Sequence, residues 1–415
     1  MPEILVVGGG AAGMMAAVSA AERGAHVTLL ERGEKLGKKI YITGKGRCNV
    51  TNDCTLDEFL AQVPHNPRFL YSALTAFGPQ DMMAFLEANG CPVEVQRGRR
   101  VFPRSEKASD VTRALTRALE RTGVRIRLNT RVRRLLTEDG RCAGLETESG
   151  ERLRADAVIL ATGGLSAPLT GSDGDGYRMT EAVGHTVLPG VASLTALETR
   201  EDWPRQLQGL SLRNVTLSLR QGKKLLYREL GEMLFTHFGI SGPLVLEMSC
   251  HLPEDLSGCA VSLNLKPGLT PEQLDARLQR EFAAAPRKQL SSILPALLPA
   301  SFAALFPALA GVPGETPCAA VTREERQRLA AALQALPLTL TRRRPIEEAI
   351  VTRGGVSVRE INPGTLESKV LPGLYVAGEL LDVDAHTGGF NLQIAFSTGR
   401  LAGRSAAEAD CSNER

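Results

Sequence analysis

Apolar and polar positions near the start of the chain follow a strand, helix, strand order. Residues 3–7 form a short apolar run that ends at Gly8, and residues 11–23 are mostly small or apolar, as expected for a tightly packed helix. Gly24 ends this helix, and a second apolar run covers residues 27–30. Three such elements within about 30 residues predict a βαβ unit with parallel strands.

The following segments continue this mixed pattern. Residues 108–123 have the apolar spacing of an amphipathic helix, and a strand follows them. Asp139 and Gly140 are typical of a hairpin turn, and residues 157–161 form an apolar strand that leads to Gly163 and Gly164. Strands and helices that alternate in this way predict an α/β fold.

The pattern changes twice in the middle of the chain and returns near the end. From about residue 193 apolar and polar positions alternate, which predicts an antiparallel β subdomain, and residues 271–336 have a composition typical of helices. Glycine-rich, strand-like sequence resumes after Pro345. We therefore expect a first domain built from both ends of the chain, residues 1–192 and 338–415. A β subdomain, residues 193–268, and a small helical subdomain, residues 269–337, interrupt it.

Composition excludes several other classes of protein. The apolar share of 43% and the charged share of 23% are those of an ordinary globular protein, and a net charge of +3 indicates no polyanionic partner. No apolar run reaches the roughly 20 residues of a membrane helix. The eight cysteines form no C-x-x-C pair. We expect free thiols in a reducing cytoplasm, with no membrane and no nucleic-acid partner; the oligomeric state stays open.

The G-x-G-x-x-G pattern is made by Gly8, Gly10 and Gly13, between the first strand and the first helix. Gly8 permits a tight turn, Gly10 lets the backbone approach a pyrophosphate, and Gly13 lets helix and strand pack closely. Glu31 ends the next strand 18 positions after Gly13, close to the roughly 20 expected for an acid that binds a ribose. The pattern predicts a dinucleotide site at the helix N-terminus.

Two later segments favour FAD over NAD as this dinucleotide. Ala161 and Thr162 precede Gly163 and give a bare backbone bend after an apolar strand. A late strand, residues 374–377, ends at Gly378 and Glu379, and Gly388 and Gly389 then open an apparent helix. The N-terminus of that helix is expected to face the flavin ring. A simple NAD dehydrogenase does not need such a returning segment.

The sequence resembles the aminoacetone oxidase-like, or BaiN/YhiN-like, bacterial FAD-dependent oxidoreductases. The resemblance covers almost the whole chain and depends on GGGAAG at 8–13, on GKK at 37–39 with TGKGRCNVTN at 43–52, and on GE at 378–379 with GFN at 389–391. It implies an FAD-binding domain of the glutathione-reductase type, interrupted by an antiparallel β-barrel-like and a small helical subdomain. Residues 171–176, GSDGDG, are more distantly similar to fumarate-reductase flavoproteins.

Site residues follow from this resemblance by position. Glu31 is expected to bind the adenosine ribose, Val132 to contact adenine through its backbone, and Asn391 and Gln393 to lie near the isoalloxazine. The full expected cofactor-binding set is Gly8, Gly10, Ala11, Ala12, Gly13, Glu31, Arg32, Lys38, Thr43, Gly44, Arg47, Cys48, Asn49, Val132, Ala161, Thr162, Gly163, Gly378, Glu379, Asp382, Gly389, Asn391, Leu392 and Gln393.

No residue stands out as the catalytic acid or base. His386 and Arg47 are the candidates, although a loop histidine is more often simply solvated. Cys48 lacks a C-x-x-C partner, so we interpret it as a packing residue. Asp173 and Asp175 lack the rest of an EF-hand pattern and are interpreted as a turn, so no metal is expected.

The expected function is an FAD-dependent oxidoreductase that moves two electrons between a small organic substrate, amine or enone-like, and NAD(P)H or oxygen as a transient partner. The resemblance covers both amine oxidation and enone reduction and does not choose between them. The arginine runs at 97–104 and 342–344 leave open a flavoprotein that binds or modifies RNA, although solvated surfaces are the simpler interpretation. A non-catalytic flavin redox sensor is the remaining alternative.

Overall fold

The computed structural model describes residues 1–409, so Cys411 lies outside the described residues. The chain divides into two compact units. The first combines Met1–Ser193 with the segment that begins at Pro345, and the second is Leu194–Arg344. The first unit therefore contains sequence from both ends of the chain, and each unit has its own hydrophobic core.

The centre of the first unit is a five-stranded sheet in the order β20-β10-β1-β2-β6. All four pairings in it are parallel, which confirms the α/β fold and the predicted βαβ unit. The strands are short and mostly buried. Their bounds are β1 Glu3–Val7, β2 His26–Leu30, β6 Arg125–Arg127, β10 Ala157–Leu160 and β20 Leu374–Val376.

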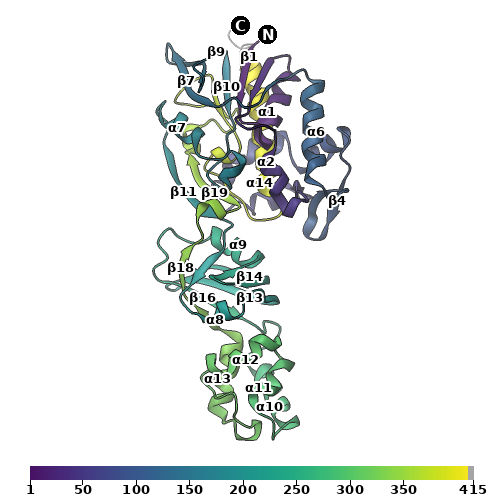
Figure 1. Cartoon of the computed structure of the whole chain (residues 1–415), viewed down its shortest axis with the longest axis vertical. Helices are drawn as coiled ribbons and strands as arrows, with labels where there is room; N and C mark the ends of the chain where they lie inside the picture. The colour runs from purple at the N-terminus through teal and green to yellow at the C-terminus, as the bar shows by residue number, and fades with distance from the viewer. Residues whose placement is uncertain (410–415) are drawn as a thin grey trace. The chain divides into compact units, whose positions relative to one another are not determined.

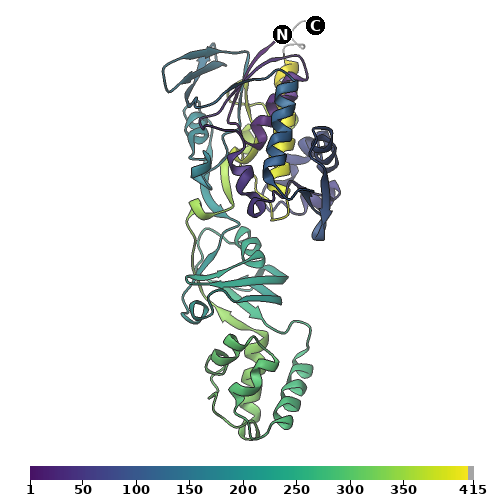
Figure 2. The same ribbon diagram turned by 45° about the vertical axis from the view of Figure 1, so that its right-hand side comes forward.

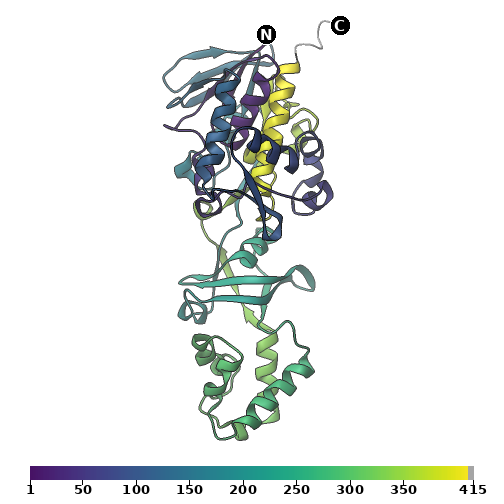
Figure 3. The ribbon, with the colours of Figure 1, turned by 90° about the vertical axis from the view of Figure 1, so that its right-hand side faces the viewer.

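Three helices pack together beside this sheet: α1 (Ala11–Ala21), α6 (Ala108–Arg121) and α14 (Phe390–Glu408). Helix α1 contacts both of the others, and Figures 1 and 3 show it between α6 and the C-terminal α14, drawn in yellow. The contact with α14 is close because Gly399 and Gly403 face α1. A Cβ atom at these positions would lie 2.2 Å from Ala12 O and 2.1 Å from Ala16 O.

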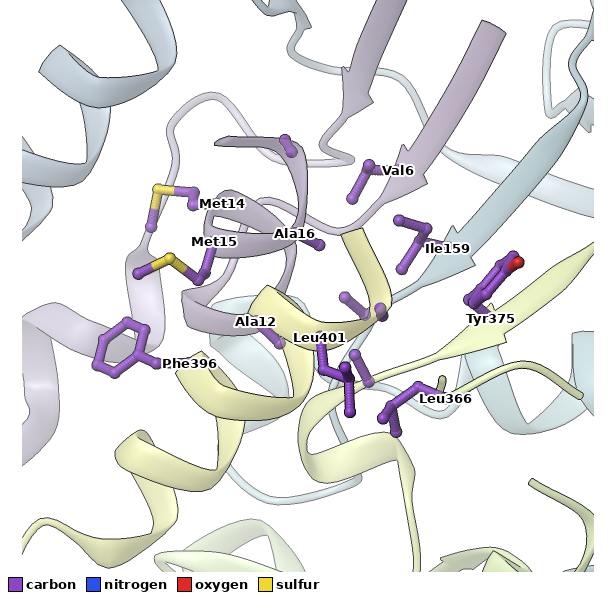
Figure 4. Close-up of a cluster of buried hydrophobic side chains, with 14 of the residues drawn as sticks. Val6, Ala12, Met14, Met15, Ala16, Ile159, Leu366, Tyr375, Phe396 and Leu401 are labelled. Carbon is purple, nitrogen blue, oxygen red and sulfur yellow. The ribbon is translucent and has the colours of Figure 1, made fainter. Parts of the chain in front are cut away.

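The core of this unit joins residues that are far apart in the sequence. Figure 4 shows Met15 of α1 and Phe396 and Leu401 of α14 in the same cluster as Ile159 of β10 and Tyr375 of β20. Each of these side chains is at most 2% exposed. Full burial of one such side chain stabilises the folded state by roughly 1.5–3 kcal/mol. The cluster therefore stabilises the packing of the returning segment against the N-terminal βαβ unit.

Smaller elements surround the central sheet. The hairpin turn predicted at Asp139 and Gly140 is confirmed, because both have positive φ, 50° and 72°, between β7 and β8. The remaining strands of the unit are β3 Thr51–Asn52, β4 Val93–Gln96, β5 Arg100–Pro103, β7 Val132–Glu138, β8 Arg141–Thr147, β9 Arg152–Arg154, β11 Val187–Ser193 and β19 Val351–Val356. Its remaining α-helices are α2 Lys38–Ile42, α3 Leu56–Leu60, α4 Tyr71–Ala76, α5 Pro79–Ala88 and α7 Asp175–Glu181.

The second unit contains a seven-stranded antiparallel sheet in the order β17-β16-β13-β14-β15-β12-β18 and a group of helices beside it (Figure 2). Strands β17 and β18 are residues 336–343, so these residues belong to the inserted unit by their pairing. The domain boundaries drawn from the sequence, with separate β and helical parts, stay a prediction. The strands are β12 Leu197–Thr199, β13 Ser211–Gln221, β14 Lys224–Thr236, β15 Gly239–Ser241, β16 Cys259–Asn264, β17 Leu336–Leu338 and β18 Leu340–Arg343. The helices are α8 Trp203–Gln206, α9 Pro243–Cys250, α10 Pro271–Ala284, α11 Leu290–Ile293, α12 Ala300–Leu309 and α13 Arg323–Gln334.

Two further observations concern the described residues as a whole. Across residues 1–409 no helix combines the length and the apolar character needed to cross a membrane. The seven cysteines in this range are free thiols.

The close contact between α1 and α14 gives a test of the fold. We expect Gly403→Ala to lower the free energy of unfolding by roughly 1–3 kcal/mol, because the new methyl group would meet a backbone oxygen that cannot rotate away. Thermal unfolding of cofactor-free protein measures this. Gly268→Ala is the matched control, because a Cβ there meets nothing within 4 Å. Equal midpoints for Gly403→Ala and wild type would contradict the packing described.

Candidate active site

A large cleft lies in the first unit, where β1 and β10 end. It offers about 1310 Å³ of empty space including its open mouth. Ligands of open α/β sheets bind outside the carboxyl ends of the strands, as here. The lining comes from the glycine loop after β1, the end of β2, helix α2, the loop after β10, and the segments 350–351 and 379–395.

The glycine loop has the geometry that the sequence predicts. Gly8 has φ of +104°, and a Cβ on it would lie 2.5 Å from Ala161 O. A Cβ on Gly13 would lie 1.8 Å from Gly8 O, so only glycine allows helix α1 to start this close to β1. A Cβ on Gly10 would meet nothing within 4 Å, because it would point into open space.

The N-terminus of α1 fits a pyrophosphate group. Gly10 is the N-cap residue, no side chain caps the helix, and the first turn contains no acidic residue. Ala11 and Ala12 line the cleft, so the free N–H groups and the positive end of the helix dipole are open to an anion. The uncapped N-terminus of α1 is the structural feature that tests the prediction of FAD, and its residues fit a pyrophosphate group.

Glu31 lies directly after β2 and is 9% exposed. Its Oε2 accepts a hydrogen bond from Gly9 N at 2.7 Å, and its Oε1 accepts one from Gly33 N at 2.7 Å. The carboxylate therefore holds the glycine loop in place. An ionised carboxylate has about four acceptor sites, so two remain for a ribose hydroxyl. Its role in ribose binding stays a prediction.

A network of arginines and aspartates lies at the same end of the cleft. Arg131, next to Val132, donates two hydrogen bonds of 2.8 Å to the carboxylate of Asp175, and Arg32 pairs with Asp173. Burial raises the pKa of Asp175, but the hydrogen bonds and positive charges of Arg131 and Arg178 together outweigh burial and leave the pKa below its usual value. The two aspartates thus balance arginine charges. In the described part of the chain no cluster of three or more His, Cys, Asp or Glu side chains could hold a metal ion.

Part of the cleft wall is formed by the returning segment. Helix α14 starts at Phe390 with Gly389 as N-cap residue and no side-chain cap, so its N-terminus is open. Asn391 Nδ2 donates to Ala385 O at 2.7 Å and to His386 O at 3.3 Å, while its Oδ1 accepts from Ala385 N at 2.9 Å. Asn391 therefore fixes the preceding loop against the helix start, while also lining the cleft.

The hydroxyl of Thr162 is buried beside Gly176 of α7, where a Cβ would lie 2.0 Å from it. Thr162 lines the cleft, and its Oγ1 has no hydrogen-bond partner among the described residues. A buried polar group without a partner costs roughly 1–3 kcal/mol.

The structure brings many of the predicted residues together and leaves others apart. Those that line the cleft are Gly8, Gly10, Ala11, Ala12, Glu31, Arg32, Lys38, Thr43, Val132, Ala161, Thr162, Gly163, Glu379, Asn391 and Leu392. Those outside the lining are Gly13, Gly44, Arg47, Cys48, Asn49, Gly378, Asp382, Gly389 and Gln393. The direct role of each in cofactor binding stays a prediction.

Several residues outside the lining have clear structural partners. Arg47 pairs with Glu106, donates to Gln96 Oε1 at 2.7 Å and lies 4.3 Å from the centre of the Phe102 ring, so it supports the β4–β5 hairpin. Cys48 is fully buried, and burial raises its pKa, which suits the packing role expected for it. Gln393 donates to Phe77 O at 3.2 Å inside the core.

Sequence reasoning missed three groups of polar residues. Lys39 lines the cleft beside Glu379, whereas the sequence points to its neighbour Lys38. Arg131 also lines the cleft, whereas the sequence points to Val132 beside it. Asp384 is fully buried, with His65 Nδ1 at 2.6 Å and the Ser193 hydroxyl at 2.6 Å. The partners in each group are far apart in the chain, so spacing gave no signal for them.

The glycine loop gives a second test. We expect Gly10→Val to fold normally but to lose FAD, because the new side chain would fill the open space in front of α1. Gly13→Val is the comparison and should impair folding itself, since its side chain would meet the backbone at Gly8. The ratio of flavin to protein absorbance and the melting temperature separate the two effects. Full flavin occupancy in folded Gly10→Val protein would contradict the assignment.

Known proteins show which family this geometry belongs to. The model of the HI0933-like protein Rossmann domain matches residues 2–405. A 3-dehydro-bile acid delta(4,6)-reductase of Clostridium scindens is 33% identical over 414 residues, which is 98% of this chain and 100% of that protein. A ribosomal RNA dihydrouridine synthase of Escherichia coli K12 is 31% identical over 404 residues, 95% of this chain and 96% of the relative.

Solved structures share the fold at low identity. The 3-ketosteroid-delta4-(5alpha)-dehydrogenase of Rhodococcus jostii RHA1 aligns with a TM-score of 0.53 and 17% identity over 98% of this chain and 97% of that one. The 3-ketosteroid delta1-dehydrogenase of Sterolibacterium denitrificans aligns with a TM-score of 0.53 and 15% identity, over 99% and 100% of the two chains. The chain belongs to the HI0933-like Rossmann family, the BaiN/YhiN-like oxidoreductases, and its cofactor is FAD.

Proposed function

We propose that the protein reduces a carbon–carbon double bond that is conjugated to a carbonyl group in a small organic substrate. The observation that carries this proposal is the similarity, over nearly the full length of both chains, to a 3-dehydro-bile acid delta(4,6)-reductase. A 3-dehydro steroid with double bonds at positions 4 and 6 is a conjugated ketone. This similarity favours the enone-like substrate over the amine. Amine oxidation stays a prediction from the sequence.

Other relatives of similar identity support the same chemical step. A dihydrouridine synthase saturates the ring double bond of uridine, which is conjugated to a carbonyl group as well. In both cases the carbon remote from the carbonyl accepts a hydride, the carbon next to the carbonyl accepts a proton, and the conjugation lowers the barrier to hydride addition. Bound FAD supplies the hydride in its reduced form. The protein must therefore hold the substrate and deliver one proton.

The electron donor in this proposal is NAD(P)H, which visits the site transiently. The sequence contains one G-x-G-x-x-G pattern between a strand and a helix, at Gly8 to Gly13, and we assign FAD to that site. The nicotinamide and the enone would then alternate at the flavin. We place the reaction in the cytoplasm, in keeping with the free thiols of residues 1–409.

His386 is the proton donor that we propose. It lies on the loop that Asn391 fixes to the start of α14, and its backbone N–H donates to Gln62 O at 2.9 Å. Its Nδ1 lies 3.2 Å from Gln62 Oε1, which orients the ring. Neither His386 nor Arg47, the other candidate from the sequence, is among the residues that line the cleft. The charge of Arg47 is already paired with Glu106 at the β4–β5 hairpin. We therefore propose only His386 as the proton donor.

A second candidate function is the reduction of uridine in RNA. The observation in its favour is that two relatives, each 31% identical over 95% of this chain, are ribosomal RNA dihydrouridine synthases. Exposed arginines on the β4–β5 hairpin, Arg97 and Arg100, would add phosphate contacts. The small net charge argues against a polyanion as the main partner.

A half-reaction experiment tests the proposal. Protein reduced by NADH or NADPH without oxygen is mixed with a steroid 4-en-3-one, with the matching saturated 3-ketone, or with uridine-containing RNA, and flavin absorbance is followed. We expect the enone to reoxidise the flavin and the saturated ketone to leave it reduced, because only the enone has a bond to saturate. Reoxidation of the flavin by RNA would favour the second candidate, provided that RNA binding to the protein also weakens steeply as the salt concentration rises.

Other outcomes would contradict the proposal directly. Reoxidation by oxygen alone, with reduction by amines in place of NAD(P)H, would return the function to amine oxidation. A flavin that none of these compounds reduces or reoxidises would indicate the redox sensor.

The role of His386 has its own test. His386→Gln should slow flavin reoxidation by the enone by about 10²–10⁴-fold, the usual contribution of a positioned acid. Flavin reduction by NAD(P)H needs no acid at the substrate carbon and should change little. Equal slowing of both half-reactions would mean that His386 only supports the loop.

A further inference from the structure

Residues 167–174 form a part of the cleft wall that we call the strap. The strap follows the buried Ser166 in the loop after β10 and leads into helix α7. Three of its residues line the cleft, namely Thr170, Gly171 and Ser172. A Cβ on Gly171 would lie 3.7 Å from Arg32 Cδ and 4.0 Å from Glu31 Oε1. The strap therefore reaches the residues that follow β2.

The order of the strands shows where the strap runs. In the central sheet β1 lies between β10 and β2, and both pairings are parallel, so the three strands end at the same edge of the sheet. The strap starts after β10 and reaches Glu31 and Arg32 after β2, whereas the glycine loop follows β1. The strap therefore passes the end of β1, at the edge of the sheet where the open N-terminus of α1 also lies.

Neither apolar packing nor backbone hydrogen bonding fastens the strap to the rest of the unit. Of residues 167–174, all of which the structure describes, none has a buried apolar side chain, and Leu169 is 96% exposed. The backbone hydrogen bonds that the strap makes in the described chain stay within it or go to Arg178 of α7. A segment with so few apolar and backbone contacts opens at a low cost in free energy.

Two aspartates connect the strap and the start of α7 to arginines of other segments. Asp173, in the strap, pairs with Arg32, and its Oδ2 lies 3.1 Å from Arg131 Nη2. Asp175, the first residue of α7, accepts two hydrogen bonds of 2.8 Å from Arg131 and lies 3.2 Å from Arg32. The four side chains are between 16% and 35% exposed, so water screens these pairs only in part. The ion pairs therefore hold the strap in place.

The same two arginines would attract an anion if the strap opened. Both Arg32 and Arg131 line the cleft, and in the closed form Asp173 and Asp175 balance their charges. FAD is an anion through its pyrophosphate group, so the open form would attract it electrostatically. The aspartates and an incoming dinucleotide thus compete for the same cations.

We propose that the strap controls the entry and release of FAD. It opens when the ion pairs of Asp173 and Asp175 with Arg32 and Arg131 separate, and it closes beside the bound dinucleotide when they form again. Opening of the strap limits the rate at which FAD leaves, as lid opening limits product release in many enzymes. This inference does not depend on the substrate, so it stands apart from the proposed reaction.

The first test is the rate of FAD release from the loaded protein, followed by flavin fluorescence after dilution. Asp173→Asn should speed release by about tenfold or more, because a neutral amide replaces the carboxylate in strong, charge-assisted contacts with two arginines. Asp173 does not line the cleft, so faster release in this variant does not reflect the loss of a direct contact with FAD.

Salt provides a second measurement, on the wild-type protein. Raising the NaCl concentration from about 0.05 M to about 0.5 M should speed release several-fold, because salt screens partly exposed ion pairs. The same increase should change the release rate of Asp173→Asn less, since that variant has already lost part of the screened interaction. Equal acceleration of both proteins would mean that salt acts elsewhere in the cofactor site.

Asp275→Asn is the matched control. Asp275 lies 2.6 Å from Arg326 Nε in the second unit, and the two side chains are 30% and 19% exposed, so this variant removes an equal charge from a similar pair. Its release rate should equal that of wild type. Equal release rates for Asp173→Asn and wild type would overturn the proposal, and so would equal acceleration of both by salt. If Asp173→Asn is isolated without FAD, the effect of salt on wild-type release decides, and a rate that salt does not raise would overturn the proposal.

Discussion

The cleft depends on a backbone contact between the two ends of the chain. Gly399 and Gly403 let α14 approach α1 so closely that any side chain there would meet Ala12 O or Ala16 O. This contact sets the start of α14 relative to the start of α1, and the two open helix N-termini are the features that suit the site to an anionic dinucleotide. The cofactor site is thus a consequence of helix packing.

The sequence predicts those parts of the structure that depend on neighbouring residues. Periodicity and glycine positions give the βαβ unit, the hairpin at Asp139 and the start of α14, since each is determined within a few residues. The motif at residues 43–52 is a less direct guide to the contacts with the cofactor. Its Thr43 lines the cleft, whereas its Asn52 donates to Gly98 O and Gly388 O at 3.1 Å and supports the loop before α14 from outside the cleft. A motif therefore marks a region more reliably than it assigns a ligand contact.

Charge pairs could not be predicted, because their partners meet only in the folded chain. Arg131 and Asp175 are 44 positions apart, and Lys39 and Glu379 are 340 apart. Both pairs line the cleft, and in both the carboxylate is held by several donors. A shielded cation without a counter-charge would be costly. Pairing lets the protein keep cationic donors beside an anionic cofactor when the site is empty as well as when it is full.

Two relatives of nearly equal identity, 33% and 31%, have names that describe very different substrates, a bile acid and ribosomal RNA. Both match this chain over almost its full length, so neither the fold nor the overall identity determines the substrate. What the two reactions share is a double bond conjugated to a carbonyl group, together with the hydride that saturates it. In the proposed reaction, the residues that line the FAD cleft serve this common step. The choice of substrate must then come from side chains outside the cofactor lining, where close relatives can differ without loss of the fold.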